Sequence, residues 1–253
     1  MKLGTVAEAS LSAGYLYLAE QDARFVTEKL WGNPADPSVI GLILPVSTDD
    51  PNTPDDGWGV VVAYNADGHV DDADAEDLDY DALLVEMQDA MPAANEERQR
   101  LGYDTISLLG WASKPYYDAV SHRIHWAKRL KAASAPENTI NADIRILGRA
   151  GYLELVAVGA ESNFPQMEAG MKDLLTQVQF IEGQHYAQYD SSMDKAAAYG
   201  VGALVAGTLA TKVGLLAKLG GLLFAFKKVI ILVVAGAGWG VARFLGRKKS
   251  NDV

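Results

Sequence analysis

Residues that could carry acid–base or metal chemistry are few in this chain. It has no cysteine, which excludes disulfides and thiolate chemistry. Its four histidines are His69, His122, His125 and His185. The sequence has no Gly-x-Ser-x-Gly turn, no His-Glu-x-x-His zinc motif, and no P-loop or Gly-x-Gly-x-x-Gly phosphate loop. We therefore predict no catalytic, metal-binding or cofactor-binding residues, and the pattern favours a protein that is not an enzyme.

One group of aromatic and histidine side chains forms a candidate cleft: Trp111, Tyr117, His122 and His125. The segment His122–Ala132 alternates in polarity, which predicts a strand in which residues three apart point to opposite faces. His122 and His125 are therefore not expected to bind one metal ion. Aromatic strand residues commonly belong to a core, so simple packing is the competing interpretation.

The most polar segment, Asn65–Asp81, has oxygen-bearing side chains at alternating positions, as a calcium loop would. Gly68 is not where an EF-hand requires it, however, and no Glu closes the loop. The carboxylates from Asp74 to Asp79 instead precede a predicted helix. There they cap free N–H groups and complement the helix dipole, so capping is the expected role of this segment.

The last fifth of the chain has the composition of membrane helices. Ala196–Ala217 contains one charged residue, and so does Val229–Leu245. The second stretch spans about 25 Å as a helix, close to the roughly 30 Å core of a bilayer. Basic residues that can reach lipid headgroups flank it: Lys227, Lys228, Arg247, Lys248 and Lys249. We expect a soluble domain over 1–183, a linker over 184–195, one or two membrane helices over 196–247 and a basic tail over 248–253.

Small residues recur every four positions in the first of these stretches: Ala198, Gly202, Ala206, Ala210 and Gly214. In a helix, this spacing gives a ridge on which another helix backbone can pack closely. The second helix belongs either to the same chain or to another copy, and the strict register favours a homo-oligomer. Chance is the alternative, because Ala and Gly are common in membrane helices.

Charge is divided sharply along the chain. Residues 196–253 carry eight Lys or Arg and one acidic residue, a net charge of +7. Residues 1–195 carry 14 Lys or Arg and 32 Asp or Glu, a net charge of −18. An acidic domain argues against nucleic acid as a partner, since phosphate binding needs clustered Lys and Arg. The basic tail instead fits a lipid bilayer with a cytoplasmic C-terminus.

Periodicity predicts an α+β domain with a mainly antiparallel sheet flanked by helices. The predicted strands are Lys2–Ala9, Leu11–Leu18, Val39–Val46, Trp58–Tyr64, Asp104–Ala112, His122–Ala132, Ile140–Gly148, Tyr152–Gly159 and Phe180–Ile181. The predicted helices are Glu20–Trp31, Phe164–Val178 and Tyr80–Leu101, which Pro92 should kink or divide. Lys114–Asp118 is expected as a turn.

Several segments together resemble one bacterial family: WGVVVAYNADGHVDDADAEDLDYDALL, ANEERQRLGY, LLGWASKPYYDAVSHRIHWAKRL, ILGRAGYLELVAV and QFIEGQHYAQYDSSMDKAAAYG, with the Gly/Ala-rich tail. The family is domain-of-unknown-function family 2167, bacterial proteins predicted to lie in membranes. The resemblance runs from about Leu3 to Lys249 and implies a soluble domain with a C-terminal membrane anchor, often behind a signal peptide. It implies no reaction. The order of elements is also similar to a PsbP-like sandwich.

The location follows from these features as an expectation. We expect the protein in the bacterial inner membrane, anchored at its C-terminus. The first residues show no apolar secretion signal. The soluble domain is expected in the periplasm if a signal peptide has been removed, and in the cytoplasm otherwise.

The sequence leaves two hypotheses for the function of the protein. The first is a non-enzymatic, self-associating interaction or envelope scaffold protein that presents its acidic surface to an unidentified protein partner. The alternative is a membrane-tethered hydrolase or small-ligand-binding domain that uses the candidate cleft. The alternative requires the four side chains of the cleft to converge on one concave pocket.

Overall fold

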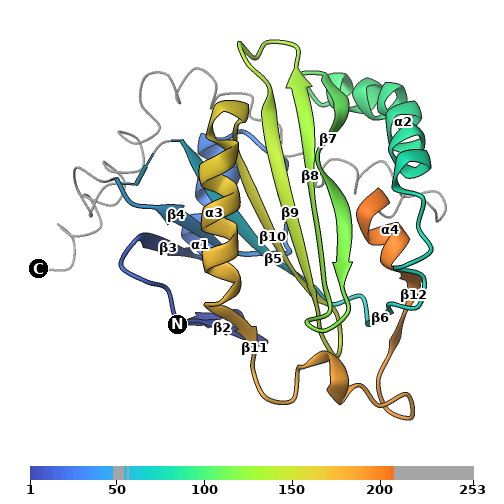
Figure 1. Cartoon of the computed structure of the whole chain (residues 1–253). Helices are drawn as coiled ribbons and strands as arrows, with labels where there is room; N and C mark the ends of the chain where they lie inside the picture. Colours follow the sequence, from blue (N-terminus) through green and yellow to red (C-terminus); the bar gives the residue numbers. More distant parts are fainter. Residues whose placement is uncertain (48–53, 56, 208–253) are drawn as a thin grey trace, which may run out of the picture.

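A seven-stranded antiparallel sheet is the centre of the fold, with strand order β3-β4-β5-β10-β9-β8-β7 (Figure 1). The computed structural model describes residues 1–47, 54–55 and 57–207. The strands of this sheet are β3 (Tyr15–Ala19), β4 (Val39–Pro45), β5 (Trp58–Asn65), β7 (Ile106–Asp118), β8 (Arg123–Ala132), β9 (Thr139–Leu147) and β10 (Tyr152–Ala160). The predicted α+β class, an antiparallel sheet with flanking helices, is confirmed.

Both faces of the central strands are buried. In β9, every residue from Ile140 to Leu147 is buried. Side chains alternate along a strand. Ile140 and Ile144 therefore pack on one face, and Asp143 and Arg145 lie on the other. The sheet thus needs cover on both sides, and the two covers differ in kind.

One face is covered by α3 (Phe164–Leu175) and by a small sheet of β1 (Lys2–Leu3), β2 (Ala7–Ala9) and β11 (Val178–Phe180) (Figure 1). Pro165 lies in the first turn of α3, where its missing N–H costs no helical hydrogen bond. The helix buries Met167, Met171 and Leu174 in the core with the sheet. We call this side of the sheet the α3 face.

The other side, here called the opposite face, is covered in separate places. The short α1 (Glu20–Arg24) and the π-helix η1 (Phe25–Leu30) pack near β4. The long α2 (Tyr80–Arg100) packs on β7, and α4 (Val201–Ala206) joins a cluster with Trp126 and Tyr152. A parallel pair, β6 (His69–Asp71) and β12 (Ala196–Gly200), lies next to α4.

Helix α2 is continuous through Pro92, so the expected division into two helices is wrong. Contacts with β7 on both sides of the proline account for this. The Gln88 amide donates to the Leu108 carbonyl at 3.0 Å, and Asn95 exchanges two hydrogen bonds with the backbone of Ile106. The helix begins as expected, because the Asp79 carboxylate caps it by accepting from two backbone N–H groups.

Two other predicted elements are corrected. Lys114–Asp118, expected as a turn, is the second half of β7, and its Tyr116 and Tyr117 pair with β8. Irregular register between Leu108 and Tyr116 lets this long edge strand follow the curvature of the sheet. Lys2–Ala9, expected as one strand, is the hairpin β1–β2, which Gly4 turns at a φ of +58°.

The start of the expected membrane helix is also corrected. Ala198 lies in strand β12, and the helix begins only at Val201, where the Asp74 carboxylate accepts from the N–H groups of Val201 and Gly202. It ends after Ala206, so Ala198 and Gly202 do not share a helix face. The rest of the ridge, Ala210 and Gly214, and the flanking basic residues Lys227, Lys228, Arg247, Lys248 and Lys249 lie outside the described residues.

The predicted linker packs on the domain. It contains the short η3 (Tyr186–Gln188), and its Asp194 forms a two-pronged ion pair with Arg149, at 2.7 and 3.0 Å. Among the helices in the described ranges, none combines the length and apolarity that crossing a membrane would take.

Candidate functional site

The sheet separates the four residues of the candidate cleft into two groups. His125 lies on the α3 face beside Tyr116, whereas Tyr117 and His122 meet on the opposite face. Trp111 is also on the opposite face, where its ring N–H donates to the Tyr80 carbonyl at 3.1 Å. The alternation that predicted opposite directions for His122 and His125 accounts for the separation. The four side chains do not line one pocket.

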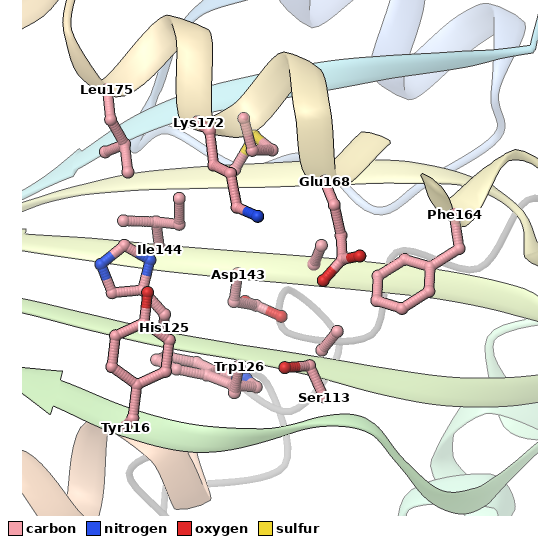
Figure 2. A pocket seen from close by; sticks show the side chains of 13 residues that line it. Ser113, Tyr116, His125, Trp126, Asp143, Ile144, Phe164, Glu168, Lys172 and Leu175 are labelled. Atoms are coloured by element: carbon pink, nitrogen blue, oxygen red, sulfur yellow. The ribbon is translucent and has the colours of Figure 1, made fainter. Parts of the chain in front are cut away.

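The α3 face contains a cavity of about 100 Å³ between α3 and strands β7 to β9 (Figure 2). Its lining residues are Ser113, Tyr116, His125, Trp126, Ala127, Ala142, Asp143, Ile144, Phe164, Glu168, Met171, Lys172 and Leu175. Small side chains in the sheet create the space, because Ala127 of β8 and Ala142 of β9 are direct partners in the ladder. Two methyl groups thus face α3 where larger side chains would fill the gap.

One wall of this cavity is a stacked pair of rings. The centroids of Tyr116 and His125 are 4.6 Å apart, with an angle of 3° between the planes. Burial, and then the charge of Arg123, lower the pKa of His125 to about 4. Burial and the nearby carboxylates of Asp118 and Glu168 raise the pKa of Tyr116. At neutral pH, both rings are therefore uncharged and both carry a proton that they can donate.

Two opposite charges lie on the α3 side of the cavity. Glu168 and Lys172 project from successive turns of α3 toward the sheet (Figure 2). Spaced four residues apart with the acid first, they have the favourable arrangement for a helical ion pair. Yet neither is in an ion pair within 4.0 Å with any residue that the structure describes. Both charges are thus available to a molecule in the cavity.

On the opposite face, Asp72 joins Tyr117 and His122. The Tyr117 hydroxyl donates to the Asp72 carboxylate, and His122 Nδ1 is 3.1 Å from both the Tyr117 oxygen and Asp72 Oδ2. Burial acts to raise the pKa of Asp72, but hydrogen bonds from Tyr117, His122 and Tyr186 outweigh it and lower this pKa. Burial and the bond to Asp72 in turn raise the pKa of Tyr117. Asp72 is therefore a carboxylate that fixes the orientation of the His122 ring.

The His122 ring is the end of a four-ring stack. The Tyr186 ring lies between two histidine rings, and its centroid is 4.0 Å from that of His122 and 4.3 Å from that of His69. Tyr189 stacks on the other side of His69, with 3.9 Å between the centroids. His122 also has a left-handed backbone, with a φ of +50°, in the turn between β7 and β8. The neighbouring hydroxyl of Ser121 donates to Asp118 and not to this histidine. The stack thus connects the β7–β8 turn with β6 and the segment before β12, and we assign it a structural role.

A charged network occupies the middle of the opposite face. Arg145 Nη2 lies 2.7 Å from Glu154 and 3.2 Å from Asp143, and Lys128 lies 3.5 Å from Asp143. The side chains of Lys128, Asp143 and Arg145 are at most 3% exposed. Burial raises the pKa of Glu154. In the described part of the chain, no group of three or more His, Asp or Glu side chains has metal-binding geometry.

The family described as "Protein of unknown function (DUF2167)" matches residues 1–238. The chain belongs to this family. This confirms the resemblance that the quoted segments indicated. Among curated proteins, none matches the sequence.

Two solved structures are similar in fold. The solution structure of cyanobacterial PsbP (CyanoP) from Synechocystis sp. PCC 6803 is 7% identical with a TM-score of 0.38, and the match covers 69% of this chain and 86% of that chain. LpqN, involved in cell envelope biogenesis of Mycobacterium tuberculosis, is 10% identical with a TM-score of 0.34, and the match covers 69% of this chain and 82% of that chain. Likeness at this level carries no argument about function.

Several residues of these sites were missed from the sequence. Asp72 stood within a run of acids, and nothing local distinguishes the one that meets His122, 50 positions later. Glu168 and Lys172 could have been noticed in the sequence. Each is a charged residue directly next to a residue of the predicted apolar stripe of this helix, Met167 or Met171. Arg145 and Glu154 gave a signal too, because each is a charge inside a predicted buried strand.

Proposed function

We propose that the protein is a non-enzymatic, membrane-anchored interaction protein whose described domain holds an apolar side chain of a protein partner in the α3 cavity. The observation that carries the proposal is the volume of the cavity, about 100 Å³. Pockets for metabolites and cofactors commonly measure about 300–1,000 Å³. A cavity of about 150 Å³ accommodates one benzene ring. The α3 cavity therefore fits one branched aliphatic group, the size of an anchoring side chain.

The lining supports the same occupant. Ala127, Ala142, Ile144, Met171 and Leu175 provide an apolar floor and wall. An anchor that fills such a pocket and loses its water is the usual energetic centre of a protein interface. The neutral pair of Tyr116 and His125 at one side adds uncharged hydrogen-bonding groups without a desolvation penalty for charge.

The hydrolase alternative is less well supported by this geometry. It required His122 and His125 in one cleft, and the sheet lies between them. His122 Nδ1 is engaged by Asp72 and Tyr117. The small-ligand alternative would use the same α3 cavity. In that case the apolar group in the cavity belongs to a small molecule and not to a side chain of a protein partner.

Membrane attachment and self-association are part of the proposal. Support for attachment comes from the two apolar stretches and their basic flanks at Lys227 and Lys248. Self-association now relies on Ala210 and Gly214. The reason is that a Cβ on Gly202 would approach Leu78 Cδ2 to 2.8 Å, so this glycine packs within its own domain. The proposed location remains the bacterial inner membrane, with the side of the domain set by any signal peptide.

Methyl NMR of the full-length protein in lipid nanodiscs tests the anchor. With ¹³C-methyl methionine labels, Met171 reports the cavity and Met193, 74% exposed, reports the solvent. Titration with N-acetyl-leucinamide should shift the Met171 signal with saturation and leave Met193 unchanged. In the variant Ala142→Leu, which fills the cavity, the shift should vanish. The matched control is Ala169→Leu, an exposed change on α3, the helix that carries Met171. This variant should leave the shift unaltered.

Two results would overturn this proposal. The first is a Met171 signal that does not respond to N-acetyl-leucinamide at any concentration up to its solubility. The second is an equal response in wild type and Ala142→Leu, which would place the binding elsewhere.

A further inference from the structure

We infer that the α3 cavity recognises the last residue of a polypeptide, taking its aliphatic side chain into the cavity and its terminal carboxylate at Lys172. The inference rests on the proposed anchoring function and names the kind of anchor. The chemistry that would be recognised is an aliphatic group on the carbon atom that bears a carboxylate. A polypeptide C-terminus and a free amino acid share this chemistry, and we commit to the polypeptide.

The polar groups around the cavity are mostly hydrogen-bond donors. Lys172 provides an ammonium, Ser113 and Tyr116 provide hydroxyls, and His125 provides a ring N–H. Two lining residues carry carboxylates, Glu168 and Asp143. The Asp143 carboxylate is paired with Arg145 and Lys128 on the opposite face, so Glu168 is the lining carboxylate without an ion pair among the described residues. A cation with neutral donors beside it matches a carboxylate, which has two oxygens and can accept several hydrogen bonds at once.

Lys172 is the natural partner of such a carboxylate. It is the only Lys or Arg among the 13 lining residues. It belongs to a domain with a net charge of −18 over residues 1–195, yet it has no carboxylate within 4.0 Å among the described residues. In Figure 2 its ammonium end reaches toward the sheet between His125 on one side and Glu168 on the other. A carboxylate between this cation and the pair of Tyr116 and His125 would meet the positive charge and two neutral donors, whereas Ser113 lies at the other end of the cavity.

Glu168 has a separate role in this arrangement. It lies one helical turn before Lys172, toward Phe164 and Ser113 in Figure 2. The backbone N–H of a terminal residue is attached to the same carbon atom as the side chain and the carboxylate. With the side chain in the cavity and the carboxylate at Lys172, this N–H can donate to Glu168. Opposite charges on neighbouring turns thus match the donor and acceptor ends of one residue.

The size of the cavity restricts the ligand further. A long acyl chain also combines apolar groups with a carboxylate, but it needs far more space than about 100 Å³. A branched aliphatic side chain such as that of leucine or valine matches this space, whereas tryptophan exceeds it. The inferred ligand is therefore a C-terminal leucine, valine or isoleucine.

A panel of four leucine derivatives tests the inference by the Met171 methyl titration of the full-length protein. N-acetyl-leucine mimics the C-terminal residue, N-acetyl-leucinamide lacks the carboxylate, leucine carries both charges, and leucinamide carries only the ammonium. We expect N-acetyl-leucine to bind about tenfold more tightly than N-acetyl-leucinamide, as expected for one charge-assisted contact at a partly exposed site. It should also bind more tightly than leucine and leucinamide.

The variant Lys172→Met keeps the aliphatic stem and removes the charge. It should bind N-acetyl-leucine and N-acetyl-leucinamide equally, with the affinity for the amide unchanged from wild type. Lys29→Met, a change at an exposed lysine of η1, is the matched control and should retain the tenfold preference. Because Lys172 is exposed, its replacement is expected to fold normally, and the unchanged amide titration verifies this.

The outcomes separate the inference from the proposed function. Equal binding of acid and amide in wild type would overturn carboxylate recognition and leave the anchor in place. Tighter binding of leucine than of N-acetyl-leucine would overturn the polypeptide as the source and favour a free amino acid. If none of the four compounds shifts Met171, the proposed function itself fails.

Discussion

The two faces of the central sheet meet the demand for burial in different ways. On the α3 face, aliphatic side chains such as Leu155 and Ile144 pack against α3, and small residues leave a cavity with Glu168 and Lys172 on its α3 side. On the opposite face, charged side chains are buried between two apolar clusters, and Arg145 is 1% exposed. The guanidinium carbon lies 5.0 Å from the centre of the Trp126 ring, and its Nε and Nη1 have no hydrogen-bond partner among the residues that the structure describes.

The difference indicates where each face can change. Aliphatic packing is non-directional, so the α3 face can tolerate an empty space and a guest within it. A buried network of charges depends on each partner, because any member left alone is an uncompensated charge. We therefore expect the α3 face to bind and the opposite face to hold one fixed arrangement.

Removing Arg145 should give the largest effect on stability. The variant Arg145→Met leaves Glu154 buried without its cation and Asp143 with only Lys128 at 3.5 Å, so the free energy of unfolding should fall by about 3–5 kcal/mol. Urea denaturation of the full-length protein measures the loss. The matched change Arg100→Met breaks an exposed pair with Glu97 and should cost less than about 1 kcal/mol. Similar losses in the two variants would contradict the contrast between the faces.

A truncation on the α3 face should cost somewhat less. Leu174 is fully buried on the side of α3 that packs on the sheet, and Leu174→Ala should lower the free energy of unfolding by about 2–4 kcal/mol through lost burial and a new cavity. Ala142→Leu, which adds atoms where space exists, should cost less than about 1.5 kcal/mol. The pair is compared by urea denaturation. If Ala142→Leu proves as harmful as Leu174→Ala, the α3 face has no usable space.

The smallest expected effect is a pH dependence from His125. Its folded pKa of about 4 lies below its ordinary value of 6.5, so the unfolded chain binds the proton more readily. The stabilising contribution is complete above pH 6.5 and is lost as the pH falls toward 4. The free energy of unfolding should drop by about 1–3 kcal/mol over this range from this group. His125→Phe keeps the stacked ring and should flatten the profile by that amount. Parallel profiles for the two proteins would show that His125 is not responsible.

Much of the sheet followed from sequence because alternation and turn residues are local signals. Ile140–Gly148 and Tyr152–Gly159 were predicted as strands of a mainly antiparallel sheet, and β9 and β10 form an antiparallel pair there. The same alternation placed His122 and His125 on opposite faces. Local signals failed where packing decides. Small residues at Ala196–Gly200 fit a helix as well as a strand, and only pairing with β6 selects the strand.

The candidate site was predictable only in its parts. The ring pair of Tyr116 and His125 depends on β7 continuing through Lys114–Asp118, where the sequence favoured a turn. The cavity depends on where α3 crosses the paired Ala127 and Ala142, and no local pattern encodes a crossing point. The partnership of Asp72 and His122 likewise needs the fold to bring distant segments together.

The cap that Asp74 provides for α4 also has a consequence for the order of folding during synthesis. Asp74 and the N–H of Val201 are 127 positions apart, so the ribosome makes the acceptor long before the donor. Until α4 is made, Val70, Trp126 and Tyr152 lack the cover that Val201 and Leu204 provide. We expect stalled chains ending at residue 195 to be cut by protease near these residues, and chains extended past 207 by the length of the exit tunnel to be protected. Equal protection of both lengths would show that this corner closes without α4. Otherwise, the domain is completed only by the residues that immediately precede the apolar tail.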